Sequence, residues 1–302
     1  MKGVPRRHGH VPTSAVLLIL GSVLCFTLLD TITKFTTRLY PVALLVWARY
    51  TVQLIAMLVW LGPSMRGSLL RTGKLRLQLA RGAVLLLSSV LFVNALRYLP
   101  LAEATAVNYS TPVLVVLLAV LLLGERMTRL RIAFVVAGIA GMLLIVRPGS
   151  ELFQGGSLFA LGAAACYAFY QIMTRMLSGE KPQVVLFYPA LLGTVVMSLL
   201  APTFDWPAHV PWTHVVLIVL GGLLGTLGHF LFILAFRHAP ASAITPFTYM
   251  QLVFAMLVGW LVYAEFPDAF TLVGMAVIAG SGLYITLHER RRTPVADPLT
   301  VD

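Results

Sequence analysis

Charged residues are scarce in this chain: they make up 11% of its 302 positions, whereas hydrophobic residues make up 59%. A soluble domain carries about 25% charged residues, so the composition excludes an ordinary soluble protein. The two cysteines, Cys25 and Cys166, both lie inside apolar stretches and imply neither a disulfide framework nor a metal site. No G-x-x-x-x-G-K-[ST], H-E-x-x-H or G-x-S-x-G motif occurs, which argues against ATP hydrolysis and the common hydrolase mechanisms.

Long apolar stretches are what the chain does contain. A helix needs about 20 mostly apolar residues to cross a membrane, and ten such stretches are separated by short loops. They cover residues 14–34, 41–62, 77–98, 100–123, 130–147, 156–177, 182–203, 212–236, 240–263 and 269–288. The first follows a basic start but is too long for a signal peptide and lacks a cleavage site. The sequence therefore predicts an all-α integral membrane protein with ten transmembrane helices.

The chain has a net charge of +11, and its basic residues are distributed unevenly between the loops on the two sides of the membrane. If successive loops alternate between two sides, 17 of the 22 lysines and arginines lie on the side of the termini, four lie on the other, and Arg49 lies within a span. This positive-inside pattern predicts cytoplasmic tails at 1–13 and 289–302. We expect a multi-pass protein of the plasma membrane, taken as the bacterial inner membrane. A nucleic-acid patch is the weaker interpretation, so the expected partners are the lipid bilayer and a small-molecule substrate, and a monomer is the oligomeric state considered.

The second half of the chain repeats the first. At a spacing of 140 residues the identical pairs include Arg97/Arg237, Pro100/Pro240, Tyr109/Tyr249 and Glu125/Glu265, and at 141 residues Cys25/Cys166 and Pro41/Pro182 also match. Each copy holds five spans, an odd number, so the second copy must cross the membrane in the opposite sense. The sequence thus predicts two inverted five-helix repeats, 14–147 and 156–288, in one integrated membrane domain. Inverted repeats around a midplane site are typical of secondary transporters; a symmetric scaffold without a pathway is the alternative.

These residues also resemble a known family. The doubled five-helix unit, the segment "LPLAEATAVNYSTPVLVVLLAVLLLGERM" and the following "VVAGIAGMLLIVRPG" are similar to EamA-type members of the drug/metabolite transporter superfamily. The resemblance implies a ten-helix transporter with a central cavity between its halves, commonly exporting amino acids, metabolites or drugs. The second copy departs from the first after the shared glutamate, where "AEFPD" stands in place of "GERMT".

Polar residues and prolines interrupt two repeat-related spans, 100–123 and 240–263. A proline inside a helix frees backbone carbonyls, and such a segment is tolerated in a membrane only where it faces protein or a water-filled cavity. We interpret both segments as walls of a substrate pathway, with Tyr109 and Tyr249 as repeat-related partners. The alternative is a pair of simple kinks whose hydroxyls bond within their own helix. The candidate residues are Asn108, Tyr109, Thr111, Thr245, Tyr249 and Gln251.

Arg49 is a charge inside a span, about 12 Å from its outer end. A charge at this depth must face the interior and find a partner. Gln53 lies one turn further on the same face. We expect Arg49 to pair with Asp30 or Glu103 on the cavity wall and to contact substrate; a structural ion pair that fixes helix packing is an equally weighted alternative.

Further candidates come from the remaining polar positions within the spans. Tyr167, Tyr170 and Gln171 indicate cavity exposure of the sixth span, although tyrosines also gather at membrane interfaces. Asp30, Glu103 and His229 are candidates for gating or proton relay.

Two of these candidates have competing interpretations. Asp30 could instead be neutralised by Lys34, four residues on along the same helix. For His229, burial in close helix packing beside Gly221 and Gly225 is favoured. Lys34 matches Arg175 in the repeat, and we expect both to extend to the interface outside the site.

The sequence predicts a secondary-active transporter of small metabolites that works by alternating access. From the resemblance, export of amino acids or related amphipathic metabolites is preferred, and uptake of a vitamin or nucleobase is the alternative. An intramembrane enzyme is the alternative from another class, disfavoured because the carboxylates within the spans are few and scattered; a channel is a third. No catalytic residue, metal or cofactor is expected.

Replacing Arg49 with Leu should abolish transport while leaving membrane insertion intact, because substrate loses its cationic partner on the cavity wall. Flux into proteoliposomes and the yield of folded protein measure the two effects. A fully active, well-folded variant would remove Arg49 from the site.

Overall fold

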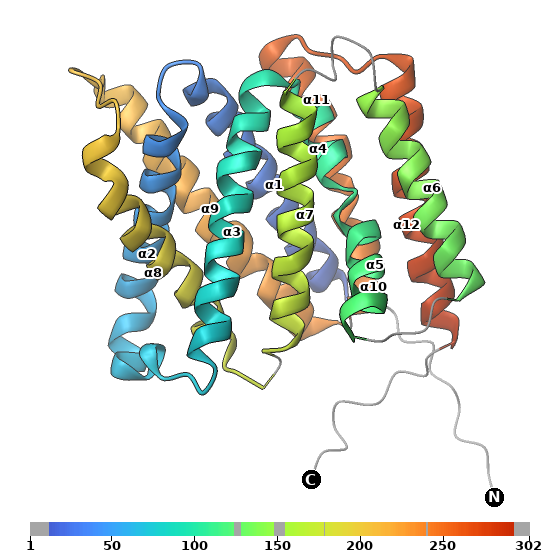
Figure 1. The fold of residues 1–302 in the computed structure, drawn as a ribbon, viewed down its shortest axis with the longest axis horizontal. Coiled ribbons are helices and arrows are strands. Elements are labelled where there is room, and N and C mark those ends of the chain that lie inside the picture. Colours follow the sequence, from blue (N-terminus) through green and yellow to red (C-terminus); the bar gives the residue numbers. More distant parts are fainter. Residues whose placement is uncertain (1–11, 124–127, 148–154, 178, 240, 293–302) are drawn as a thin grey trace, which may run out of the picture.

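The computed structural model describes residues 12–123, 128–147, 155–177, 179–239 and 241–292 (Figure 1). The first half contains α1 (Thr13–Thr37), α2 (Val42–Met65), the 3-10 turn η1 (Arg66–Leu70), α3 (Leu75–Tyr98), α4 (Leu101–Asn108), α5 (Thr111–Leu123) and α6 (Arg129–Val146). The second half contains α7 (Gly156–Arg175), α8 (Pro182–Leu200), the turn η3 (Ala201–Thr203), α9 (Trp212–His238), α10 (Ala241–Thr248), α11 (Met250–Tyr263) and α12 (Ala269–Arg292). Most of both expected tails lies outside the described residues.

The helices confirm the predicted fold class. Within the described ranges, ten spans are long and apolar enough to cross a membrane, counting α4 with α5 and α10 with α11 as one span each. Many large apolar side chains on their outer surfaces are exposed, such as Leu121, Leu199 and Leu261. Exposed apolar side chains of this number are suited to lipid rather than water. The protein is therefore a multi-pass membrane protein.

The two halves run in opposite directions through the bundle. We call the side on which α1 begins and α12 ends the near side, and the opposite side the far side; α7 begins on the far side (Figure 1). The first span of each half packs against the third span of the other half, as α1 against α9 and α7 against α3, and α2 packs against α8. The interface between the halves thus forms from repeat-equivalent pairs of helices.

Both predicted interruptions are present. The fourth span breaks between α4 and α5 at Tyr109 and Ser110, and the ninth breaks between α10 and α11 at Tyr249. Pro112 is the second residue of α5, whereas Pro246 lies inside α10, where it cannot donate a helical hydrogen bond. The freed backbone groups lie inside the bundle, which is where the bilayer allows them.

Glycines allow α6 and α12 to approach each other at the backbone. A Cβ added to Gly274 would lie 2.6 Å from the carbonyl oxygen of Gly141, and one added to Gly141 would lie 2.9 Å from the carbonyl oxygen of Gly274. Such reciprocal contacts are the small-residue packing found between membrane helices. Gly280 on α12, in contrast, has no neighbour within 4 Å of its added Cβ.

We expect Gly274→Ala to lower the free energy of unfolding by about 1–3 kcal/mol, because the added methyl must push two backbones apart. The matched variant Gly280→Ala should be neutral or gain up to about 1 kcal/mol from its higher helix propensity. Reversible unfolding in detergent micelles measures both, and equal stabilities would contradict the close α6–α12 contact.

Candidate functional site

The two interrupted spans meet near the middle of the bundle through a pair of tyrosines. The ring centroids of Tyr109 and Tyr249 lie 5.5 Å apart. The Tyr109 hydroxyl donates to the carbonyl oxygen of Thr248 at 2.6 Å and lies 3.1 Å from Oε1 of Gln251. Tyr109 therefore spans from the break in the first half to the break in the second, as the repeat predicts for this pair.

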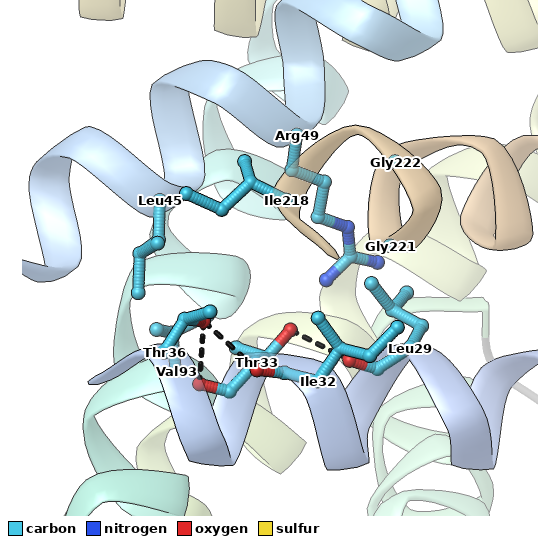
Figure 2. A pocket seen from close by; sticks show the side chains of 10 residues that line it. All are labelled: Leu29, Ile32, Thr33, Thr36, Leu45, Arg49, Val93, Ile218, Gly221 and Gly222. Atoms are coloured by element: carbon cyan, nitrogen blue, oxygen red, sulfur yellow. Dashed lines mark hydrogen bonds between the residues drawn. The ribbon is translucent and has the colours of Figure 1, made fainter. Parts of the chain in front are cut away.

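Arg49 lines a pocket between α1, α2, α3 and α9 (Figure 2). Its side chain extends from α2 toward α1, and its guanidinium lies near Leu29 and Gly221 (Figure 2). The pocket's lining residues are Leu29, Ile32, Thr33, Thr36, Leu45, Arg49, Val93, Ile218, Gly221 and Gly222. The threonine hydroxyls in it donate to carbonyls of their own helix, so the guanidinium is the charged group of this small pocket.

Asp30 is the acidic residue that interacts electrostatically with Arg49. It is 7% exposed and lies within electrostatic reach of Arg49 and of Tyr109. Among the residues described, however, no acidic side chain lies within 4.0 Å of the Arg49 guanidinium, so the expected direct ion pair is absent from this conformation. A cation and an anion that face the same interior without neutralising each other can each hold the opposite charge of a bound molecule.

Tyr167 and Tyr170 bring the sixth span into the same region. Their rings stack with centroids 5.4 Å apart. Tyr167 lies within electrostatic reach of Arg49, and Tyr109 lies within reach of Tyr167. Arg49, Asp30 and the tyrosines thus lie in one region of the bundle, although neither Asp30 nor a tyrosine lines the pocket that Arg49 enters.

The other lining candidates have different surroundings. Thr111 is buried and donates to the carbonyl oxygens of Asn108 at 2.7 Å and Ala164 at 3.4 Å, so its hydroxyl is occupied by backbone, which was the competing interpretation. Gln53, Asn108 and Gln171 are half-buried. The side chain of Thr245 lies outside the described residues.

His229 packs against α1. Its ring lies edge-on to Phe26 with centroids 4.9 Å apart, and the adjacent Gly228 accepts a hydrogen bond from Ser22 at 2.8 Å. A Cβ on Gly228 would lie 2.8 Å from the Phe26 ring. These contacts favour the packing interpretation, although His229 also lies within electrostatic reach of Arg49.

A charged cluster on the far side was missed from the sequence. Lys34 is 3% exposed, and its ammonium donates to the carbonyl oxygen of Leu99 at 2.5 Å and lies 3.2 Å from Oε2 of Glu265. Arg38 approaches Oε1 of the same carboxylate at 3.6 Å. The expectations that Lys34 extends to the interface or neutralises Asp30 are therefore wrong. The pairing joins α1 of the first half to the loop after α11 of the second.

A signal for this cluster is present in the repeat. Position 34 is basic in both copies, as Lys34 and Arg175, and position 265 is acidic in both, as Glu125 and Glu265. Two positions that carry opposite charges in both copies indicate an ion pair between them.

Glu103 belongs to this far-side neighbourhood and not to the surroundings of Arg49. It is buried in the first turn of α4, within electrostatic reach of Lys34, Glu265, Arg147 and Asp268. The expectation that Glu103 could pair with Arg49 is therefore not met.

Arg147 and Asp268 form a second far-side ion pair, between the end of α6 and the loop before α12. Burial opposes ionisation of Asp268, but hydrogen bonds from Thr271 and Arg147 outweigh it, so the pKa of Asp268 lies below its ordinary value. Asp268 also accepts from the backbone N–H of Thr271 at 2.9 Å and so caps α12. Both far-side pairs hold the start of the tenth span against the first half.

A match to a family model identifies the family to which the chain belongs. The model of the EamA-like transporter family matches residues 13–147 and again 154–287. The chain belongs to this family. An EamA-type protein is a transporter and not an enzyme.

Curated relatives are named as transporters of different solutes. The chain is 28% identical to an S-adenosylmethionine uptake transporter of Rickettsia conorii, over 87% of this chain and 88% of the relative. It is 26% identical to a riboflavin transporter of Vibrio cholerae, over 94% and 96%. It is 28% identical to a pseudopaline exporter of Pseudomonas aeruginosa, over 88% and 93%. A solved crystal structure with 22% identity, a TM-score of 0.65 and coverage of 93% of this chain and 99% of the other supports the fold.

The far-side pair generates a stability prediction. Glu265→Leu leaves the buried Lys34 ammonium with the Leu99 carbonyl and the Tyr263 ring but without its paired carboxylate, and should lower the free energy of unfolding by about 3 kcal/mol. The double variant Lys34→Met, Glu265→Leu should recover most of this loss, because the buried charge has gone. A double variant as unstable as Glu265→Leu alone in a double-mutant cycle would show that the two side chains are not coupled.

Proposed function

We propose that this EamA-type transporter carries a small amphipathic metabolite by secondary-active, alternating access. The observation that carries the proposal is the meeting of the two helix breaks at Tyr109 and Tyr249, beside the charges of Arg49 and Asp30. A polar centre between inverted repeats is the arrangement around which such transporters rock.

The far-side pair supplies one of the two closures that alternating access requires. Lys34 and Glu265 join opposite halves, and Tyr263 adds a hydrogen bond to the carbonyl oxygen of Thr31 at 2.5 Å. In the inverted repeat the equivalents of Lys34 and Glu265 are Arg175 and Glu125. We propose that separation of the far-side pair opens the pathway to the far side; Glu125 lies outside the described residues.

The side chains of the centre suggest the substrate class. Arg49 suits a carboxylate, Asp30 an ammonium, and the tyrosines an apolar or planar group that stacks against them. Amino acids and related amphipathic metabolites combine these features, and we propose their export as the first candidate function. The relatives named for S-adenosylmethionine and pseudopaline transport support a metabolite with charged groups.

Uptake of a vitamin or nucleobase is the second candidate. It is favoured by the relative named as a riboflavin transporter and by the tyrosines of the centre, which can stack on a planar ring. The charge count supports a cytoplasmic near side, and the bacterial sources of the relatives support the bacterial inner membrane as the location.

Flux of labelled tyrosine, S-adenosylmethionine and riboflavin in proteoliposomes tests the proposal. We expect one of these to enter with saturating kinetics, to be accelerated by unlabelled solute on the other side, and to be recovered chemically unchanged. Arg49→Gln should reduce carboxylate flux at least tenfold, because one buried charge-assisted contact contributes about 1.5–3 kcal/mol. The control Arg97→Gln alters an exposed arginine and should keep wild-type flux.

Two outcomes would contradict alternating access. Flux that rises linearly with concentration and shows no acceleration by solute on the other side would indicate a channel. Conversion of the solute during passage would indicate an enzyme. Loss of flux in Arg97→Gln as well as Arg49→Gln would show that the effect of Arg49 is not specific to the centre.

A further inference from the structure

A fully buried arginine lies on the near side of the bundle. Arg81 is 0% exposed and sits on α3, about 9 Å from the helix start. Its guanidinium lies over the Tyr170 ring, 4.8 Å from the centroid, and donates to the carbonyl oxygen of Val185 and, at 3.5 Å, to the Thr174 hydroxyl. Arg81 is therefore enclosed by α3, α7 and α8.

This cation has no counter-charge among the residues described. No acidic side chain of the described ranges lies within 4.0 Å of it, and its electrostatic neighbours are the tyrosines Tyr167 and Tyr170. A buried charge inside a membrane is normally paired, because desolvation is expensive. A tyrosine ring and a carbonyl compensate it only in part. An anion that enters from elsewhere would complete the pairing.

Gln78 adds unpaired hydrogen-bonding groups at the same place. It lies one turn before Arg81 on α3 and is 0% exposed, and neither its amide nitrogen nor its amide oxygen has a partner. The Arg81 Nε is unpaired as well. Each buried unpaired group is destabilising by about 1–3 kcal/mol, so three at one site require an explanation. The Arg81 Nε–H and the Gln78 amide N–H are the two donors that a carboxylate group needs.

The repeat relates this site to the Arg49 pocket. Gln78 and Arg81 correspond at a spacing of 140 to Ile218 and Gly221, and Tyr170 and Thr174 correspond at 141 to Leu29 and Thr33. All four counterparts line the pocket that Arg49 enters (Figure 2). Where Arg81 lies on the near side, the far side has Gly221 and a small pocket, and its guanidinium comes from α2 instead.

One residue connects the two guanidinium groups. Tyr167 lies within electrostatic reach of both Arg49 and Arg81, and it stacks on Tyr170, which holds Arg81. Tyr167 therefore lies in the region between the two arginines.

We propose that Gln78 and Arg81 form a second carboxylate subsite on the near side of the transport pathway, the counterpart of Arg49 on the far side. The subsite is closed in this conformation, and separation of α3 from α8 exposes it by releasing the Arg81 contact with Val185. The substrate carboxylate binds Arg81 and Gln78 when the pathway opens to the near side and Arg49 when it opens to the far side. This inference rests on the proposed transport function and deepens it.

Binding of two matched probes to the purified protein tests the subsite. N-acetyltyrosine carries a carboxylate, and N-acetyltyrosinamide is the same molecule with a neutral amide. We expect the wild type to bind the carboxylate at least tenfold more tightly than the amide by calorimetric titration. Arg81→Gln should reduce this preference at least tenfold, and Arg81→Lys should retain part of it, because the charge remains while the paired donors are lost.

The Gln78→Leu variant distinguishes an effect on carboxylate binding from an effect on folding. Leucine removes two unpaired buried polar atoms, so the thermal unfolding midpoint should stay equal to or above that of the wild type. The carboxylate preference should nevertheless fall at least threefold. The control Arg97→Gln should leave both properties unchanged.

The outcomes distinguish the subsite from the transport proposal. A wild type without carboxylate preference, or a preference that survives in both Arg81→Gln and Gln78→Leu, overturns the subsite. Selective binding that depends on Arg81 in a protein without flux in proteoliposomes supports the subsite and overturns transport. Normal flux with unchanged binding in both variants overturns the subsite alone.

Discussion

In a bilayer, any polar group that leaves regular helical bonding must be satisfied within the protein, and this constraint organises the whole structure. The interrupted fourth and ninth spans can exist only where they face each other, and Tyr109 bonds from one break to the carbonyl and amide groups of the other. The charges within the spans follow the same rule. Arg49, Asp30 and Arg81 all point between helices and not toward lipid.

The inversion of the halves divides these polar groups between the two sides. On the far side, Lys34 and Glu265 join the halves, and Arg147 and Asp268 hold the tenth span to the fifth. On the near side, Arg81 is fully buried between helices, and its far-side counterpart Gly221 lines the small pocket that Arg49 enters. The two ends of one symmetric fold are thus closed by different groups. An asymmetry of this kind is what a transporter needs if its two ends open in turn.

Sequence reasoning could predict the features that depend on one span or on the repeat. Apolar length fixed the ten spans, and prolines with neighbouring polar residues located the breaks at Tyr109 and Tyr249. It failed where a partner is remote in the chain. The sequence near Lys34 suggests a partner on α1 or an end at the membrane interface, but the partner of Lys34 is Glu265, which lies beyond α11. Arg81 gave no repeat signal, because its counterpart is Gly221.

The distance between the halves at each end, measured by electron paramagnetic resonance, tests alternating access most directly. Spin labels at the exposed Leu39 and Phe266 report the far side, and labels at the exposed Leu122 and Met176 report the near side, in a protein whose two cysteines are replaced. The account predicts opposite changes on adding transported solute, one distance lengthening as the other shortens. Two distances that stay constant, or that lengthen together, would contradict it.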